Sequence, residues 1–362
     1  MQSVRIIDGD GHLNEPPEEV ARFLPPPYRD KGFRTREQLV PPLDHLHFRV
    51  GETPATRSGR GVVGPEGWLA FLDDVGIEST VLYTTLGLPV GNITSRDWAI
   101  AFTRGYNDWL HATYVTRSPR FKGMALLPMQ EPEAAVEELR RSVEDLGMCG
   151  AMLPSNGLPV HLGSREYWPV YREADRLGCA IGIHGGAHWR MGLDDMNVYT
   201  PVNALGHAFG QARSLAGIVF NGIFDKFPNA RFGFLEAGVA WFLMCLERFD
   251  RAHETHTQID PRGDLQGPQP DEKVSQYLRR HIEAGRLFVG CEGHEPEIGQ
   301  AVRRVGNKPF LYSSDFPHEV TNETCKEEIG ELLENEDLRW EDKEAILCKN
   351  AERFYSLGVP VA

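Results

Sequence analysis

The chain has 362 residues, of which 41% are hydrophobic, so it can bury a large core in one or two domains. Its net charge of −14 and its scattered basic residues argue against nucleic acids and anionic membrane surfaces as partners. Six cysteines without a CxxC pair, no basic and apolar leader, and no apolar run of about 18 residues favour a reduced, cytoplasmic protein without a membrane span.

Short apolar runs alternate along the chain with amphipathic segments of helical length. The apolar runs predict strands at residues 4–8, 79–85, 121–128, 149–155, 179–186, 231–238, 286–293 and 309–315. Most are continuously apolar, which is typical of parallel strands covered on both faces. Residues 131–147 and 164–178 predict helices, the second with a serine cap and a terminal glycine.

This alternation predicts an α/β fold of the (β/α)8 TIM-barrel type, built from residues 1–362 as a single domain. A doubly wound open sheet is the alternative, but no glycine-rich phosphate loop follows the first strand. Residues 24–64, rich in proline, glycine and charge, form a loop insertion after the first strand that we interpret as a lid or an interface arm. We expect such a barrel to form a homodimer or a higher homo-oligomer.

Carboxylates and imidazoles gather at the predicted strand ends. They are Asp8, Asp10, His12 and Glu15 at the first strand, His184 at the fifth, Glu236 at the sixth, Glu292 and His294 at the seventh, and Asp315 and His318 at the eighth. Active sites of TIM barrels form at the carboxyl ends of the strands, so we expect these side chains to meet there. A divalent cation would remove the cost of keeping buried carboxylates charged.

Four of these residues predict a metal site. Asp10 and His12, two apart on an extended segment, point to the same side and can bind one ion together. His184 and Asp315 can complete the set and leave a position for water or a small-molecule substrate. The oxygen and nitrogen donors suit Zn²⁺, Mn²⁺ or Fe²⁺ and do not choose among them. We interpret Asp8 as a hydrogen-bond acceptor at the strand end and not as a ligand.

The chain resembles the decarboxylase-like (ACMSD-type) branch of the amidohydrolase superfamily of metal-dependent TIM barrels. The resemblance is carried by IDGDGH near the start, GIHGG in the middle, NGIFDKFPNARFGFLEAG, and LYSSDFPH near the end. It implies that Asp10 and His12 take the places of the first two metal ligands of the family. It further implies that His184 and Asp315 match the remaining two.

Two departures from the family pattern bear on the number of ions. The lysine that can bridge two metals from the fourth strand is absent from CGAMLPSNG, which favours a single-metal site. The histidine of the sixth strand is replaced by Glu236, which can act as a general base or bind a second metal itself. Glu236, His207 and Glu15 are therefore the candidate ligands of a second ion.

The leading hypothesis is a metal-dependent hydrolase or non-oxidative decarboxylase (a carboxy-lyase) acting on a small organic acid or ring compound. In it Glu236 serves as base or proton donor, and His207 or His318 orients the reactants. The alternative is an O₂-dependent monooxygenase with a dinuclear centre of two iron ions, in which Glu236 and either His207 or Glu15 bind the second ion. A third hypothesis, a barrel that has lost catalysis and acts as a partner subunit, conflicts with the intact charged groups at the strand ends.

Overall fold

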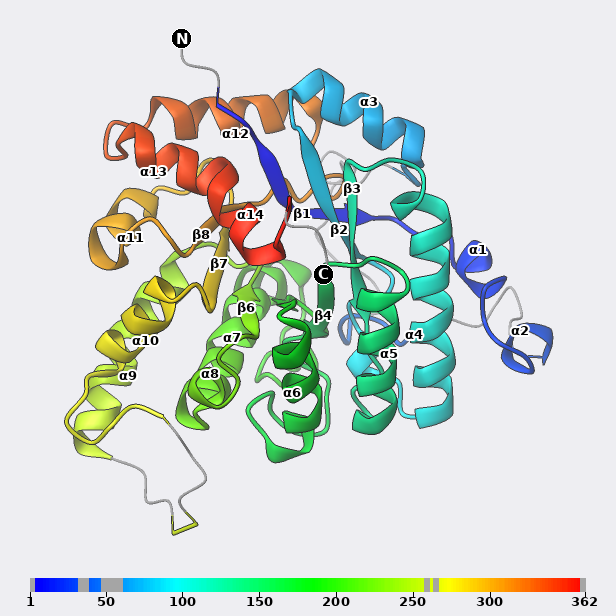
Figure 1. Cartoon of the computed structure of the whole chain (residues 1–362), viewed down its shortest axis with the longest axis horizontal. Helices are drawn as coiled ribbons and strands as arrows, with labels where there is room; N and C mark the ends of the chain where they lie inside the picture. The colour runs from blue at the N-terminus through cyan, green and yellow to red at the C-terminus, as the bar shows by residue number, and fades with distance from the viewer. Residues whose placement is uncertain (1–3, 32–38, 47–60, 257–260, 263–266, 359–362) are drawn as a thin grey trace.

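The computed structural model describes residues 4–31, 39–46, 61–256, 261–262 and 267–358. Its strands are parallel, pair with their neighbours in chain order and are surrounded by helices (Figure 1). The strands are β1 (Ile7–Leu13), β2 (Ser79–Thr84), β3 (Phe121–Leu126), β4 (Gly150–Pro154), β5 (Ala180–His184), β6 (Arg231–Phe234), β7 (Leu287–Cys291) and β8 (Phe310–Tyr312). The (β/α)8 TIM barrel predicted from the sequence is confirmed.

The α-helices are α1 (Pro17–Ala21), α2 (Tyr28–Lys31), α3 (Pro65–Val75), α4 (Arg96–Leu110), α5 (Pro132–Glu144), α6 (Trp168–Leu177), α7 (Tyr199–Phe220), α8 (Ile223–Lys226), α9 (Ala240–Thr255), α10 (Val274–Glu283), α11 (Ile298–Val305), α12 (Asn322–Glu334), α13 (Trp340–Glu344) and α14 (Asn350–Tyr355). Short 3₁₀ or π segments are η2 (Val90–Asn92), η3 (His111–Val115), η4 (Arg165–Tyr167) and η5 (Ala345–Lys349). In the described part of the chain, no helix combines the length and the apolar character that crossing a membrane requires.

The two helices predicted in detail are present as α5 and α6. α5 buries Ala135, Leu139 and Val143 on one face, as their spacing predicts. α6 ends at Gly178, whose φ of 58° is the left-handed conformation that glycine adopts without strain. The predicted cap at Ser164 is wrong, because a 3₁₀ turn follows this residue and its side chain caps no backbone N–H.

The first strand begins later and runs further than predicted. We expected a strand at residues 4–8 with the ligands beyond its end, whereas β1 extends to Leu13. Asp10 and His12 therefore lie inside the strand, where parallel pairing with β2 holds their backbone. Because strands were predicted from apolar runs, the polar side chains of this part of β1 led to a strand that ended too early.

A local irregularity in β1 accompanies these polar residues. The register against β2 shifts between Asp8 and Gly11, so one extra residue bulges out of the ladder there. A Cβ at Gly11 would lie 2.5 Å from Thr80 Oγ1, and one at Gly9 would lie 2.5 Å from a methyl group of Leu311. The glycines of IDGDGH are therefore required by the close approach of the neighbouring strands.

Hydrogen bonds between the first strand and the segment after the last one close the barrel. The N–H of His12 donates to the carbonyl oxygen of Phe316 over 2.7 Å. The N–H of Asp315 donates to the carbonyl oxygen of Asp10 over 3.1 Å. Residues from the two ends of the chain are thereby fixed beside one another.

Part of the insertion after β1 contacts the segment between β5 and α7. Residues 32–38 and 47–60 lie outside the described residues, so the interpretation of 24–64 as a lid or an arm stays a prediction. Residues 39–46 of the insertion form three hydrogen bonds to the segment after β5. The N–H of His188 donates to Leu43 O over 2.8 Å, and Nε1–H of Trp189 donates to Pro42 O over 3.0 Å. Nε2 of His45 lies 2.6 Å from Met196 O. Residues 39–46 are therefore held against the segment that follows His184.

Candidate metal centre

The structure brings the four predicted metal ligands together at the carboxyl end of the barrel. Asp10 and His12 come from β1, His184 ends β5, and Asp315 follows β8. Asp10, His12 and His184 are all buried. β5 lies across the barrel from β1 and β8, so the shared site exists only once the sheet has curved round.

The donor atoms of Asp10, His12 and His184 lie at the distances expected around one ion, and Asp315 approaches this group beside His12. His12 Nε2 is 3.0 Å from His184 Nε2. Asp10 Oδ1 lies 3.5 Å from His12 Nε2, and Asp10 Oδ2 lies 3.4 Å from His184 Nε2. Asp315 Oδ1 lies 3.7 Å from His12 Nε2. A tetrahedral ion with bonds of about 2.0–2.1 Å keeps its donors about 3.3 Å apart. Asp10 Oδ1 is buried without a hydrogen-bond partner among the described residues, so these side chains fit a divalent cation.

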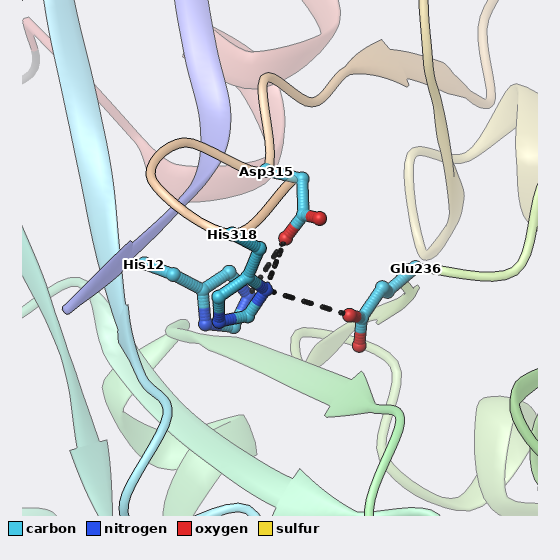
Figure 2. A group of neighbouring side chains, drawn as sticks. All are labelled: His12, Glu236, Asp315 and His318. Carbon is cyan, nitrogen blue, oxygen red and sulfur yellow. Dashed lines mark ion pairs between the residues drawn. The ribbon is translucent and has the colours of Figure 1, made fainter. Parts of the chain in front are cut away.

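A second group of donors shares His12 with the first. It consists of His12, Glu236, Asp315 and His318, whose donor atoms lie within 4.8 Å of one another. Figure 2 shows the rings of His12 and His318 side by side, with Asp315 and Glu236 pointing toward His318. The two rings stack with centroids 4.2 Å apart, and His318 Nδ1 lies 2.7 Å from Asp315 Oδ1 and 3.9 Å from Glu236 Oε1.

Glu236 follows β6 and lies between two histidines. Its Oε2 is 3.1 Å from both His184 Nδ1 and His207 Nδ1. Burial disfavours the charged carboxylate, but His207 and His184 outweigh burial and hold the pKa of Glu236 well below its ordinary value. Burial likewise opposes the charged form of His184, yet Asp10 and Glu236 raise its pKa to about 10. Glu236 is therefore an ionised acceptor, which is the state that a general base requires.

His207 and a third histidine, His318, both adjoin this carboxylate, and the pKa of each is raised. Despite burial, Asp315 raises the pKa of His318 to about 9. His207, on α7, has its pKa raised by Glu236 against the opposing effect of burial. Its ring also contacts that of His188 edge to face, with centroids 5.1 Å apart. The site thus combines metal-binding donors with groups that can give and take protons.

Two non-glycine residues of the site have strained backbones. Glu236 has a φ of 55° and Asp315 a φ of 53°, both in the left-handed region that non-glycine residues rarely adopt. Such conformations cost about 1–3 kcal/mol each and persist only where the surrounding structure enforces them. Both side chains face the same site, which is the pattern found at functional centres.

Two of the proposed second-metal ligands lie outside both donor groups of the described residues. Among the members of the two donor groups, His207 forms its ion pair with Glu236. Glu15 accepts the N–H groups of Thr85 and Leu86 on its Oε2, at 3.2 and 2.9 Å. Burial raises the pKa of Glu15 to about 7. Glu15 belongs to neither donor group of the described residues and its carboxylate holds the segment after β2, so its role as a second-metal ligand stays a prediction.

A cavity adjoins the donor groups. Its lining includes the carboxylates of Asp10, Glu236, Glu292, Glu295 and Asp315, and no lysine or arginine is among the described residues that line it. These carboxylates would repel an anionic substrate unless a bound cation offset their charge. The electrostatics of the cavity therefore also favour a metal.

A family model described as amidohydrolase matches residues 7–357. The chain belongs to the amidohydrolase family. The gamma-resorcylate decarboxylase of Rhizobium radiobacter is 35% identical to this amidohydrolase over 311 residues, which cover 75% of this chain and 86% of the relative. The 2-amino-3-carboxymuconate-6-semialdehyde decarboxylase of Dictyostelium discoideum is 26% identical over 289 residues, covering 79% of this chain and 74% of the relative.

A solved structure has the same fold as this amidohydrolase. It is a dihydroxybenzoic acid decarboxylase from a Polaromonas species, with bound manganese and the inhibitor 2-nitroresorcinol. The two structures align with a TM-score of 0.67 at 19% sequence identity, covering 99% of this chain and 98% of the other. The family resemblance predicted from the sequence is confirmed.

Asp8 links β1 of the amidohydrolase to the segment after β8. Its Oδ2 accepts the hydroxyls of Thr80 at 2.6 Å and Ser314 at 2.9 Å, and its Oδ1 accepts the N–H of Ser314 at 2.9 Å and that of Asp10 at 3.2 Å. Burial outweighs these bonds and raises the pKa of Asp8 to about 6. The interpretation of Asp8 as a hydrogen-bond acceptor is confirmed.

Two residues of the amidohydrolase site were not found from the sequence. The hydroxyl of Thr85, directly after β2, lies 2.7 Å from His318 Nε2. Glu295 accepts the N–H groups of Val239 and Glu292 at 2.6 and 2.8 Å, which joins the segments after β6 and β7. The position of Thr85 at the carboxyl end of a predicted strand was the one signal that pointed to it.

Proposed function

We propose that this amidohydrolase is a divalent-metal-dependent carboxy-lyase that removes CO₂, without oxidation, from an aromatic acid with a hydroxyl group beside the carboxylate. The observation that carries the proposal is the adjacency of the metal-donor set to the protonated His318 in one site. The gamma-resorcylate decarboxylase relative, at 35% identity, supports this substrate class. The manganese in the Polaromonas structure supports a divalent ion.

Asp10, His12 and His184 would hold the ion, because their donor atoms lie within 4.8 Å of one another, and Asp315 would join them through its position 3.7 Å from His12 Nε2. When bound, the ion supplies positive charge that fixes the carboxylate of the substrate and its neighbouring oxygen. No basic side chain is among the described residues that line the cavity, so the positive charge that binds the substrate carboxylate would have to come from the ion.

Loss of CO₂ leaves the electron pair of the broken carbon–carbon bond on the ring carbon, which must then take up a proton. His318 holds a proton at neutral pH and its Nδ1 faces the carboxylates of the site, so we assign it as proton donor. Glu236 is ionised and its Oε1 lies 3.9 Å from His318 Nδ1, so it can accept a proton from water and pass it to His318 after His318 has protonated the ring carbon. His207 would orient Glu236 through the contact at 3.1 Å.

The O₂-dependent monooxygenase stays the second candidate, because His12, Glu236, Asp315 and His318 offer donors for another ion. The relatives described above are named decarboxylases and lend this candidate no support. The number of ions per chain separates the two candidates.

The test combines metal counting with product analysis. The metal content per chain is measured by plasma mass spectrometry on protein purified without added metal. The wild type, Glu236→Ala and the surface control Glu297→Ala are compared. The same preparations are incubated with 2,6-dihydroxybenzoate in air and under nitrogen, and CO₂ and resorcinol are quantified. We expect one divalent ion per chain in all three proteins, and CO₂ release by the wild type that is independent of O₂.

Two outcomes would contradict the proposal. Two iron ions per chain, one of them lost in Glu236→Ala, together with O₂ consumption would establish the monooxygenase. A protein that retains no divalent metal and releases no CO₂ from any hydroxybenzoate would favour the partner-subunit hypothesis.

A further inference from the structure

We propose that Thr85 is a positioning residue that holds His318 with Nδ1 facing the metal site. Thr85 Oγ1 lies 2.7 Å from His318 Nε2, and Asp315 Oδ1 lies 2.7 Å from His318 Nδ1. The two ring nitrogens are therefore engaged on opposite sides, which fixes the rotation of the imidazole. Without the contact to Nε2, the ring would keep its stacking on His12 and its contacts at Nδ1 but would have no hydrogen bond from the other side.

The same hydroxyl also reaches a proposed metal ligand. Thr85 Oγ1 lies 3.5 Å from His12 Nδ1, and the rings of His12 and His318 stack with centroids 4.2 Å apart. Partners of the outer nitrogen commonly fix the orientation of a metal-binding imidazole. The Thr85 hydroxyl is thus placed between the outer nitrogens of two stacked rings, one proposed to bind the ion and the other to donate the proton.

The backbone of Thr85 is itself held in place. Its N–H group lies 3.2 Å from both the carbonyl oxygen of Leu13 and Glu15 Oε2. The N–H of Leu86 donates to the same oxygen of Glu15 over 2.9 Å. Because Glu15 is buried and belongs to the segment that follows β1, the hydroxyl is anchored to the strand that also carries His12.

A hydroxyl suits this position because it can either donate or accept a hydrogen bond. It can pair with Nε2 of His318 whether or not that nitrogen carries a proton. A valine has the same shape as threonine and can do neither, whereas a serine retains the hydroxyl. The substitution series therefore separates the hydrogen bond from the packing of the side chain.

The test uses Thr85→Val, Thr85→Ser and Thr85→Ala, with Thr103→Val as matched control. Thr103 is a buried threonine on α4 whose hydroxyl bonds Ala99 O of its own helix, away from the site. We measure kcat and KM for 2,6-dihydroxybenzoate, the metal content, and the imidazole ¹⁵N resonances of His-labelled, metal-free protein at fixed pH. In Thr85→Val we expect kcat to fall about 10-fold to 100-fold with KM and metal content unchanged, because misplacing a reacting group costs up to about this factor.

We further expect the His318 resonances to shift in Thr85→Val and Thr85→Ala, while Thr85→Ser and Thr103→Val resemble the wild type. Unchanged kcat and resonances in Thr85→Val, or equal losses in Thr85→Ser and Thr85→Ala, would overturn the inference. If Thr85→Val does not fold, the serine and alanine variants, which differ only in the hydroxyl, decide. The role of His318 as proton donor rests on the proposed function, but the orientation of its ring does not. If the wild type had no decarboxylase activity, only the proposed function would be rejected. The His318 resonances would still show whether Thr85 orients the imidazole ring.

Discussion

His12 Nε2 and His184 Nε2 lie 3.0 Å apart in a buried site, although β1 and β5 stand on opposite sides of the barrel. Two imidazole nitrogens at this distance can share at most one proton between them, and two charged rings would repel each other. A cation is the group that both nitrogens can bind at once. This relationship, with Asp10 beside both rings, is the strongest geometric argument for a metal.

Removing one of these two imidazoles should empty the metal site. We expect His184→Ala to lower the affinity for Mn²⁺ or Zn²⁺ at least about 100-fold, because a ligand is lost and its partner groups are left unpaired. Elemental analysis after dialysis should show almost no metal in this variant. His111→Ala is the control, since His111 bonds Leu146 O on the outside of the barrel and its loss should leave the metal content unchanged.

Glu236→Gln should abolish most of the turnover without releasing the ion. A general base typically contributes about 10²-fold to 10⁴-fold, so we expect kcat to fall by that factor. The amide keeps the size of the side chain but cannot accept a proton. If kcat were unaffected while the metal content halved, Glu236 would be a ligand of a second ion.

The two possible replacements of Asp8 should differ sharply in stability. Asp8→Ala leaves the N–H groups of Ser314 and Asp10 and two buried hydroxyls without their acceptor, so we expect a loss of about 3–5 kcal/mol in urea denaturation. In Asp8→Asn the amide oxygen can accept both N–H groups. The hydroxyls of Thr80 and Ser314 can rotate to accept from the amide nitrogen, so we expect a loss under about 1 kcal/mol. Equal losses in the two variants would contradict this account.

Glu15 should destabilise the protein as the pH rises. Its pKa is raised from 4.5 to about 7 in the folded state, so between these values the unfolded chain releases a proton that the folded chain keeps. The contribution of Glu15 to the free energy of unfolding is therefore highest below pH 4.5 and declines until about pH 7. We expect Glu15→Gln, whose amide oxygen can accept both N–H groups, to match the wild type at pH 5 and to exceed its stability at pH 8. Urea denaturation at the two pH values measures this, and a variant less stable at pH 8 would refute it.

Glu295→Gln should behave in the opposite way, although the chemical change is the same. Burial raises the pKa of Glu295 to about 8, so its charge is also unfavourable at high pH. However, Glu295 uses both oxygens, one for the N–H of Val239 and the other for that of Glu292. The amide nitrogen of glutamine would face one of these donors, which costs about 1–3 kcal/mol. We expect a lower urea midpoint than the wild type at pH 5, where Glu15→Gln shows no change.

The sequence predicted those features that depend on the order of apolar and polar residues. Six of the strands were placed within three residues at each end, because strands covered on both faces must be apolar throughout, and the predicted end of β6 lies four residues beyond the observed one. β1 was displaced because Asp8, Asp10 and His12 are polar yet buried, and partners from other strands compensate their polarity. Such compensation depends on tertiary contacts and leaves no local pattern.

The candidate site was predictable as a set of residues but not as a set of contacts. Strand ends place Asp10, His12, His184 and Asp315 at one end of any such barrel, so their encounter follows from the fold. The choice between Glu15 as a ligand and Glu15 as a loop anchor depends on side-chain direction, which the sequence does not contain. Thr85 carries no distinctive chemistry until the neighbouring His318 is known.

The hydrogen bond from the N–H of Asp315 to the carbonyl oxygen of Asp10 joins residues far apart in the sequence, so it can form only late in synthesis. The first ligand pair leaves the ribosome early, whereas Asp315 emerges only when most of the chain has been translated. A nascent N-terminal fragment would hold two of the four donors and would bind metals weakly and without selection. Loading of the ion is therefore a late step that follows the closure of the barrel, and metal content reports on completed folding as well as on catalytic competence.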